Sequence, residues 1–173
     1  LPKPEALFIV VENKAATTSV GQGVSQLIGY QKAEEIPHLF HFAQVLIAAN
    51  KNEMRYATVG SSKKYWLTWH DEDDLDAEIH ALINVSLSDV EKAALFSGDF
   101  AVAQAYFEEM AAAGVRAVTE QDRILYALCR PGRLLELVRT FTVFDGGVRK
   151  IARYQQYFGI QRALARIQSR TSD

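Results

Sequence analysis

The sequence is poor in cysteine, with Cys129 alone among its 173 residues. A single cysteine cannot form a disulfide within the chain, which fits a reducing compartment, so we expect a cytoplasmic protein. The chain also lacks an apolar run of roughly 18 residues, the length that a membrane span needs. Its first residues lack the charged start and apolar core of a signal peptide. We therefore expect no membrane role.

An excess of charge of one sign is missing as well. The 19 Lys and Arg residues nearly balance the 21 Asp and Glu residues. The chain as a whole is therefore not a polybasic nucleic-acid binder, and any contact with DNA has to come from a local patch. Hydrophobic residues make up 49% of the chain and charged residues 23%, which is typical of a globular protein with a sizeable core.

Several motifs are absent. The sequence has no G-x-x-x-x-G-K-[ST] phosphate loop, and "GQG" lacks the spacing of a dinucleotide fingerprint, so the chain should not hydrolyse ATP. His38 and His41 have no cysteine or second histidine pair to complete a zinc site. The acidic run "HDEDDLD" lacks the EF-hand spacing and its glycine, and we interpret it as a solvated loop.

What is present begins with an α/β pattern. We predict an apolar strand over residues 6–14, a helix over residues 22–33, and strands over residues 43–50 and 51–60 joined by hairpin-type turn residues. This strand–helix–strand–strand order predicts an α/β core with a mixed sheet.

From about residue 75 the pattern is helical. "SLSDVEKAALF" opens with a capping box from Ser88 to Glu91, and the amphipathic stretch "FAVAQAYFEEMAAAG" stops at Gly114. A further helix is predicted over "RPGRLLELVRTFTVF", and "DGG" breaks the chain before a long basic helix that starts at "VRKIARYQQYF". We expect a helical connector at residues 71–145 and a basic helix at residues 146–173.

The first strand ends in an acid and a base. Side chains alternate across a strand, so Glu12 and Lys14 share one face and Asn13 points to the other. A carboxylate can hold Mg²⁺, and a lysine on the same face can orient a water and stabilise charge on a phosphate. The same pair can equally be a salt bridge at the rim of a sheet, and the pair alone leaves both readings open.

The following helix adds a second pattern. Gln26 and Tyr30 lie four residues apart and share one face, where they would sit beside a metal pocket and reach a DNA backbone. Alternatively, Gln26 is solvated and Tyr30 packs at the edge of the helix. Arg55, Lys63 and Lys64, with aromatic residues nearby, form a candidate phosphate-contacting surface, although exposed lysines are commonly only solvated.

Together these segments resemble a known family. The run "VVENK … GVSQLIGYQKAEEIPHLFHFAQVLIAANKNEMRYATVG" resembles the nuclease domain of the motor/endonuclease (R) subunit of type I restriction enzymes. "ALCRPGRLLELVRTFTVFD" and "VRKIARYQQYFGIQRAL" resemble the segments that lead from that nuclease toward an ATP-driven translocase. The resemblance covers residues 6–70 and 124–168. It implies a restriction-endonuclease-like, PD-(D/E)xK core over residues 1–70, with double-stranded DNA as the substrate.

The resemblance also implies roles for single residues. Glu12 would be the acid that binds Mg²⁺, the Asn13 backbone carbonyl a further metal ligand, and Lys14 the catalytic lysine. Gln26 and Tyr30 would support cleavage and hold DNA.

Two features depart from the family pattern. The family's first metal-binding aspartate lies on the preceding strand, upstream of Leu1, so we expect a fragment whose site lacks one ligand. The ATPase motor is missing too, and ATP would serve only the longer parent protein, where Gln155 resembles a glutamine that contacts adenine. In the simpler interpretation, Gln155 belongs to a helix with an apolar packing stripe and solvated arginines.

We therefore expect part of a restriction subunit that cuts double-stranded DNA with Mg²⁺ and acts with modification and specificity subunits. The alternative is a non-catalytic module that docks a DNA motor onto partner subunits, and a third reading is a stand-alone nuclease of the same superfamily. The arrangement of Lys14, Gln26 and Tyr30 around Glu12 discriminates between catalysis and docking.

Overall fold

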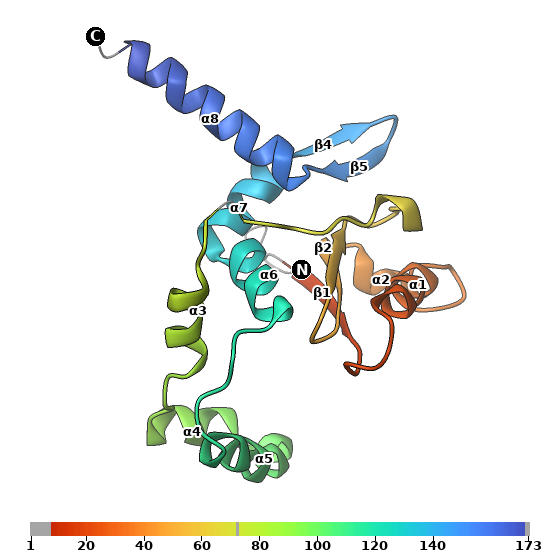
Figure 1. The fold of residues 1–173 in the computed structure, drawn as a ribbon. Coiled ribbons are helices and arrows are strands. Elements are labelled where there is room, and N and C mark those ends of the chain that lie inside the picture. The colour runs from red at the N-terminus through yellow and green to blue at the C-terminus, as the bar shows by residue number, and fades with distance from the viewer. Residues whose placement is uncertain (1–7, 72, 172–173) are drawn as a thin grey trace. The chain divides into compact units, whose positions relative to one another are not determined.

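The computed structural model describes residues 8–71 and 73–171. The chain forms two compact units: Leu1–Asp73 with Thr119–Asp173 make up unit 1, and Asp74–Val118 make up unit 2. Figure 1 shows the helices and strands of each unit. None of the described helices combines the length and the apolar character needed to cross a bilayer.

A three-stranded mixed sheet forms the centre of unit 1 (Figure 1). β1 (Phe8–Asn13) pairs in parallel with β2 (Ala43–Ala49), and β2 pairs antiparallel with β3 (Met54–Ala57). A helical crossover joins β1 to β2, as a parallel pair requires, and a short turn joins β2 to β3. The predicted α/β class with a mixed sheet is confirmed.

One face of the sheet is covered by α1 (Val20–Tyr30) and the short α2 (Pro37–Phe40). The side chains buried on this side come from one stripe of α1, from α2 and from alternate positions of β2: Val20, Val24, Leu27, Phe40, Leu46 and Ala48. α1 begins at Val20 rather than at residue 22, because the Ser19 hydroxyl accepts a hydrogen bond from the Gly21 amide and caps the helix there.

The opposite face of the sheet is covered by α6 (Glu120–Cys129) and α7 (Pro131–Arg139). Their apolar side chains pack on the remaining alternate positions of the strands, and the main members of this core are Val45, Ile47, Tyr56, Ile124, Leu128 and Leu137. Both helices fall within the connector predicted at residues 71–145, yet they belong to the same unit as the sheet. Because β2 is apolar on both faces, it needs a cover on each.

A β-hairpin stands where we predicted helices on both sides of "DGG". β4 (Thr142–Asp145) and β5 (Val148–Ile151) pair antiparallel, and α8 (Tyr154–Thr171) begins only after them. Gly146 and Gly147 have φ angles of 58° and 78°, the left-handed conformation that a two-residue hairpin turn requires. The helix prediction was wrong here, because "DGG" forms a hairpin turn between two β-rich runs and does not simply end a helix.

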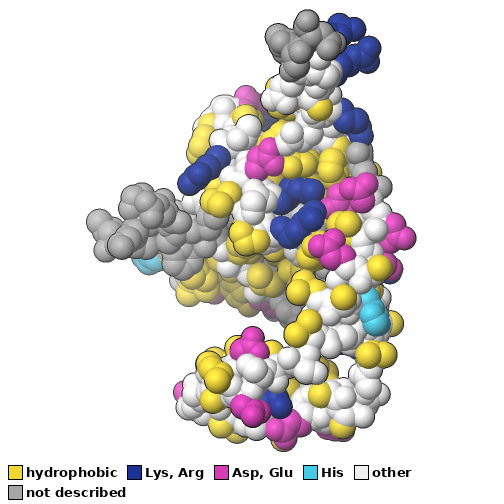
Figure 2. Space-filling view, turned by 90° about the vertical axis from the view of Figure 1, so that its left-hand side faces the viewer, with side chains coloured by type: hydrophobic (Ala, Val, Ile, Leu, Met, Phe, Trp, Pro, Cys, Tyr) yellow, Lys and Arg dark blue, Asp and Glu magenta, His cyan; other side chains and the backbone are white. Residues whose placement is uncertain are grey.

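Unit 2 consists of short helices, with α3 (Asp76–Ile83), α4 (Asp89–Leu95) and α5 (Ala101–Ala112) as its α-helices. The capping box predicted at the start of α4 is confirmed, and so is the end of α5 before Gly114, which has a φ of 94°. Hydrophobic and acidic side chains lie together on the surface of α4 and α5, at the bottom of Figure 2.

Candidate functional site

The acid and the base at the end of β1 form a direct ion pair. The Lys14 ammonium donates a hydrogen bond to a Glu12 carboxylate oxygen at 2.7 Å, and only 17% of the Lys14 side chain and 22% of the Glu12 side chain are exposed. The two side chains do share one face of the strand, as alternation predicts. The pair is therefore much better sheltered from water than an ordinary surface salt bridge.

Glu12 belongs to a row of residues that crosses the sheet. It is in register with Ala48 of β2, and Ala48 is in register with Arg55 of β3. Residues in register point to the same face and neighbouring strands lie about 4.8 Å apart, so Arg55 leaves the sheet roughly 10 Å from Glu12 on the α1 side. The Arg55 guanidinium pairs with Glu53 at 2.7 Å. One face thus carries both a predicted metal ligand and a predicted phosphate contact.

α1 comes close to this row at Gly23. A Cβ atom placed on Gly23 would lie 3.4 Å from the Ala48 Cβ and 3.4 Å from the Glu12 Cγ. Both distances are within ordinary van der Waals contact, so the first turn of α1 packs on the end of β1 at Gly23. The first turn of α1 therefore helps to shelter the Glu12 side chain from water.

Gln26 and Tyr30 lie about one and two turns further along α1 than Gly23. Gln26 is exposed, whereas Tyr30 is half-buried and packs against the core beneath α1. Lys63 lies beside the same helix, since its ammonium is 3.4 Å from the Ser25 hydroxyl. The structure thus brings Lys63 next to α1, leaves Gln26 open to solvent and gives Tyr30 a packing contact.

Asn13 points to the opposite face, where its side-chain oxygen accepts a hydrogen bond from the Gln121 amide of α6 at 3.0 Å.

The loop after Lys14 is held by Asn50, a buried residue that follows β2. Its amide donates to the Thr18 carbonyl at 2.8 Å, and its oxygen accepts two backbone amides of the next turn. From the sequence, Asn50 was predicted only as a turn residue. The contact between Asn13 and Gln121 has no local sequence pattern that would predict it.

A metal ion at this site would meet the Glu12 carboxylate. Residues 8–71 and 73–171 contain no group of three or more His, Cys, Asp and Glu side chains that could hold a metal ion. Mg²⁺ is often bound by one or two carboxylates, with water and phosphate oxygens as its other ligands. The Glu12 carboxylate has the right donor chemistry for such an ion, and Lys14 competes with the ion for it. The roles predicted for Glu12 and the Asn13 carbonyl stay predictions.

Two other residues singled out from the sequence lie elsewhere in unit 1. Lys64 is exposed, and its ammonium lies 4.8 Å from the centroid of the Tyr65 ring. Gln155 is exposed in the first turn of α8, and it is the neighbouring Gln156 that lines a pocket of this unit. The nucleic-acid and nucleotide contacts assigned to Lys64 and Gln155 stay predictions.

Comparison with known proteins gives one family. Residues 5–65 match the family model of the type I restriction enzyme R protein N terminus. No curated protein matches the chain, and no solved structure matches it. The matched segment includes Glu12 and Lys14 and extends to the 3₁₀ turn η1 (Lys63–Tyr65). Residues 5–65 therefore carry the sequence pattern of the type I restriction enzyme R protein N terminus, which confirms the resemblance of this segment. The resemblance of residues 124–168 stays a prediction.

Proposed function

We propose that this chain supplies the nuclease part of a type I restriction R subunit, with a PD-(D/E)xK fold and Mg²⁺-dependent cleavage of double-stranded DNA. Its partners would be modification and specificity subunits, and ATP-driven translocation would belong to the longer parent protein, where Gln155 would contact adenine. The family match to residues 5–65 supports an R subunit, a component of a multisubunit restriction complex that acts on DNA.

The sheltered Glu12–Lys14 pair is the observation that carries the cleavage proposal. Taking two charges out of water is unfavourable unless they are closely paired, so a mostly buried ion pair is a poor source of stability. Both side chains are largely withdrawn from solvent, and the Glu12 side chain lies against the first turn of α1. A catalytic role for Glu12 and Lys14 therefore explains a sheltered ion pair at the end of β1 better than a contribution to stability does.

Each residue at the strand end has a role in this proposal. Glu12, with the Asn13 carbonyl, would hold the Mg²⁺ ion, which supplies Lewis-acid stabilisation of charge on the scissile phosphate. Lys14 would release its hydrogen bond to Glu12, orient the attacking water and keep a positive charge beside the phosphate. Gln26 and Tyr30 would contact the DNA from α1.

Backbone phosphates further along the duplex would meet cations on the α1 side. Arg55 leaves the sheet on that face, and Lys63 lies against α1. Lys64 is exposed next to Lys63 and would add a third contact. These contacts would carry no sequence information, which fits a subunit whose target is chosen by another component.

A non-catalytic module that docks a DNA motor onto partner subunits is the second candidate. It is favoured by the donor set, because the described residues offer no three-residue metal cluster at Glu12. The packing of Tyr30 into the core under α1 favours it too. In this case Glu12 and Lys14 form a structural ion pair and bind no metal.

Paramagnetic Mn²⁺ discriminates between the two candidates. In amide NMR spectra of the chain, substoichiometric Mn²⁺ should broaden the resonances of residues 12–14 and of the first turn of α1, which lies against Glu12. Glu12→Gln should abolish this broadening, because an amide is a far weaker metal ligand than a carboxylate. Glu109→Gln, which removes an exposed carboxylate of α5, is the matched control and should leave the broadening intact.

The contrary result is equally clear. If wild-type resonances of residues 12–14 stay sharp, or if Glu12→Gln leaves the broadening unchanged, Glu12 is not a metal ligand. The docking module would then be the better description of the chain.

A further inference from the structure

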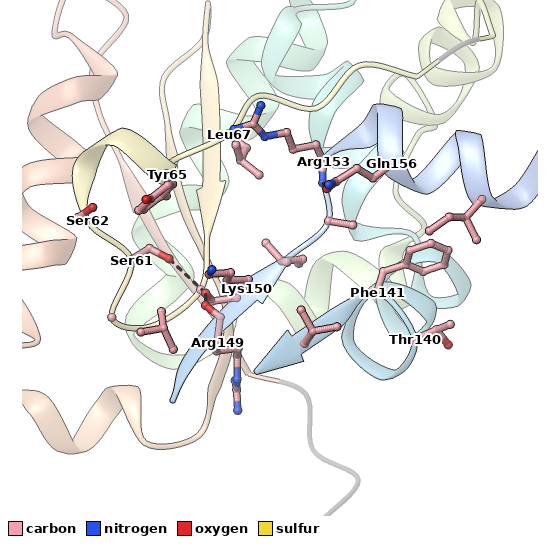
Figure 3. A pocket seen from close by; sticks show the side chains of 17 residues that line it. Ser61, Ser62, Tyr65, Leu67, Thr140, Phe141, Arg149, Lys150, Arg153 and Gln156 are labelled. Atoms are coloured by element: carbon pink, nitrogen blue, oxygen red, sulfur yellow. Dashed lines mark hydrogen bonds between the residues drawn. The ribbon is translucent and has the colours of Figure 1, made fainter. Parts of the chain in front are cut away.

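A pocket of about 660 Å³ lies in unit 1, between the segment that follows β3, the β4–β5 hairpin and the start of α8 (Figure 3). Its volume falls within the range of small-molecule and nucleotide sites. Apolar side chains line much of it, with Phe141, Ile151 and Ile160 among them. A cluster of hydroxyl groups lies on one side, from Ser61, Ser62 and Tyr65.

The charge of the pocket wall has one sign. Arg149, Lys150 and Arg153 line it, and none of the described residues that line it is an Asp or a Glu. The chain as a whole, in contrast, has a net charge of −2. A concave, cationic wall around an apolar interior attracts an anion that also carries an apolar or aromatic body.

Lys150 is the cation that a ligand in the pocket would meet. Side chains alternate along β5, so Lys150 points toward the side of Ser61 and Tyr65 while the Arg149 guanidinium points away (Figure 3). Arg149 instead donates to the Ala43 carbonyl at 3.2 Å. Lys150 pairs with Asp145 at the surface, where both side chains are more than half exposed. A phosphate can replace a carboxylate in a surface pair of this kind at little cost.

Tyr65 provides an aromatic surface beside this cation. It lines the pocket, is 52% exposed, and has the Lys64 ammonium 4.8 Å from its ring centroid. Exposed aromatic rings among lysines are the surfaces on which the bases of single strands stack, because every base has a π-face. The Ser61 hydroxyl donates to the Thr58 hydroxyl, whose own proton goes to the Arg149 carbonyl. Ser62 is therefore the serine of this segment that can donate to a phosphate oxygen.

We propose that this pocket binds single-stranded nucleic acid, with one base stacked on Tyr65 and neighbouring phosphates held by Lys64 and Lys150. A strand fits better than a free mononucleotide because the cations continue beyond the pocket, where Lys63 and Lys64 are exposed along η1. The proposal shares Lys63 and Lys64 with the duplex contacts proposed above, but it does not depend on cleavage at Glu12.

Fluorescence anisotropy with a labelled oligothymidylate of about 12 nucleotides, a length that single-strand binding folds cover, tests the proposal on the whole chain. We expect Tyr65→Ala and Lys150→Glu each to raise the Kd by on the order of ten-fold, through the loss of stacking and of a phosphate contact. Tyr65→Phe should keep the affinity because it keeps the ring. Lys51→Glu, an exposed charge reversal in the turn before β3, is the matched control and should change the Kd by less than about two-fold.

Competition identifies the source of the base and phosphate. Unlabelled oligothymidylate should displace the probe, whereas a duplex of the same length, thymidine monophosphate and ATP should compete far less well. Equal competition by either mononucleotide would make the pocket a mononucleotide site, and equal competition by the duplex would make it a site for DNA of either form; each result would overturn the proposal. The proposal would also be overturned if the wild-type chain does not bind the oligonucleotide, or if Lys51→Glu weakens binding as much as Lys150→Glu does.

Far-UV circular dichroism of each variant separates lost binding from lost folding, and Lys150→Gln replaces Lys150→Glu if the reversal unfolds the hairpin.

Discussion

The Glu12–Lys14 pair should show a measurable coupling free energy. The perturbation is a double-mutant cycle that combines Glu12→Gln, Lys14→Met and the double variant. Each single change leaves one charge without its partner in a site where the two side chains are only 22% and 17% exposed. The double variant removes both charges, so it should be more stable than the sum of the single changes predicts.

The magnitude follows from distance and burial. Two unit charges 2.7 Å apart attract by roughly 6 kcal/mol at an effective dielectric constant of about 20. Most of this attraction is offset by the loss of hydration, and fully exposed pairs retain about 0.2–1 kcal/mol. For a pair whose side chains are 17% and 22% exposed, we expect a coupling free energy of about 1–2 kcal/mol.

Urea unfolding followed by tryptophan fluorescence is the assay, because Trp66 and Trp69 are both buried in unit 1. The Glu53–Arg55 pair is a matched control, with the same 2.7 Å separation but side chains that are 39% and 37% exposed. Its coupling should stay below about 0.5 kcal/mol. If the two pairs couple equally, or if the Glu12–Lys14 coupling is below about 0.3 kcal/mol, burial does not strengthen the pair and the reasoning is wrong.

Three further predictions concern the core, a loop and a thiol. Leu137→Ala should lower the free energy of unfolding by about 2–4 kcal/mol in urea titrations, because Leu137 is fully buried under the sheet, whereas the half-buried Leu135→Ala should lower it by less. Asn50→Ala should lower the free energy of unfolding by about 1–3 kcal/mol, since the Asn50 side chain forms hydrogen bonds with three backbone groups. It should also speed hydrogen exchange in the turn after β2, and unchanged exchange would contradict this. Burial raises the pKa of Cys129 from about 9 to about 11. The buried, neutral Cys129 thiol therefore contributes fully to the stability of the fold below pH 9, and this contribution is lost as the pH rises through about 11. Iodoacetamide near neutral pH should accordingly label the native chain far more slowly than the urea-unfolded chain, and equal rates would refute the shift.

Local patterns predicted much of the fold. Alternation along β1 put Glu12 and Lys14 on one face, and they are hydrogen-bonded to each other. The apolar run of residues 43–50 predicted the strand β2, and helices cover both of its faces. The capping box of α4 fixed its start, because a serine three residues before a glutamate satisfies two backbone amides at once.

The rest depends on contacts between distant parts of the chain. No local pattern indicates that α6 and α7 complete the core of the sheet. Nor does one predict the hydrogen bond between Gln121 and Asn13, which lie 108 positions apart. The hairpin was missed because "DGG" fits both a helix break and a hairpin turn, and only its pairing decides. The cationic pocket was missed for the same reason, since the segment after β3, the hairpin and α8 each supply part of its wall.

DNA cleavage by a restriction complex assembled with an R subunit that carries this chain tests the central claim most directly. Glu12→Gln and Lys14→Met should each abolish Mg²⁺-dependent cleavage of double-stranded DNA while leaving assembly of the complex and its binding to DNA intact, and Glu109→Gln should have no effect. Undiminished cleavage by the Glu12→Gln complex would contradict the claim that the acid–lysine pair at the end of β1 is the nuclease site.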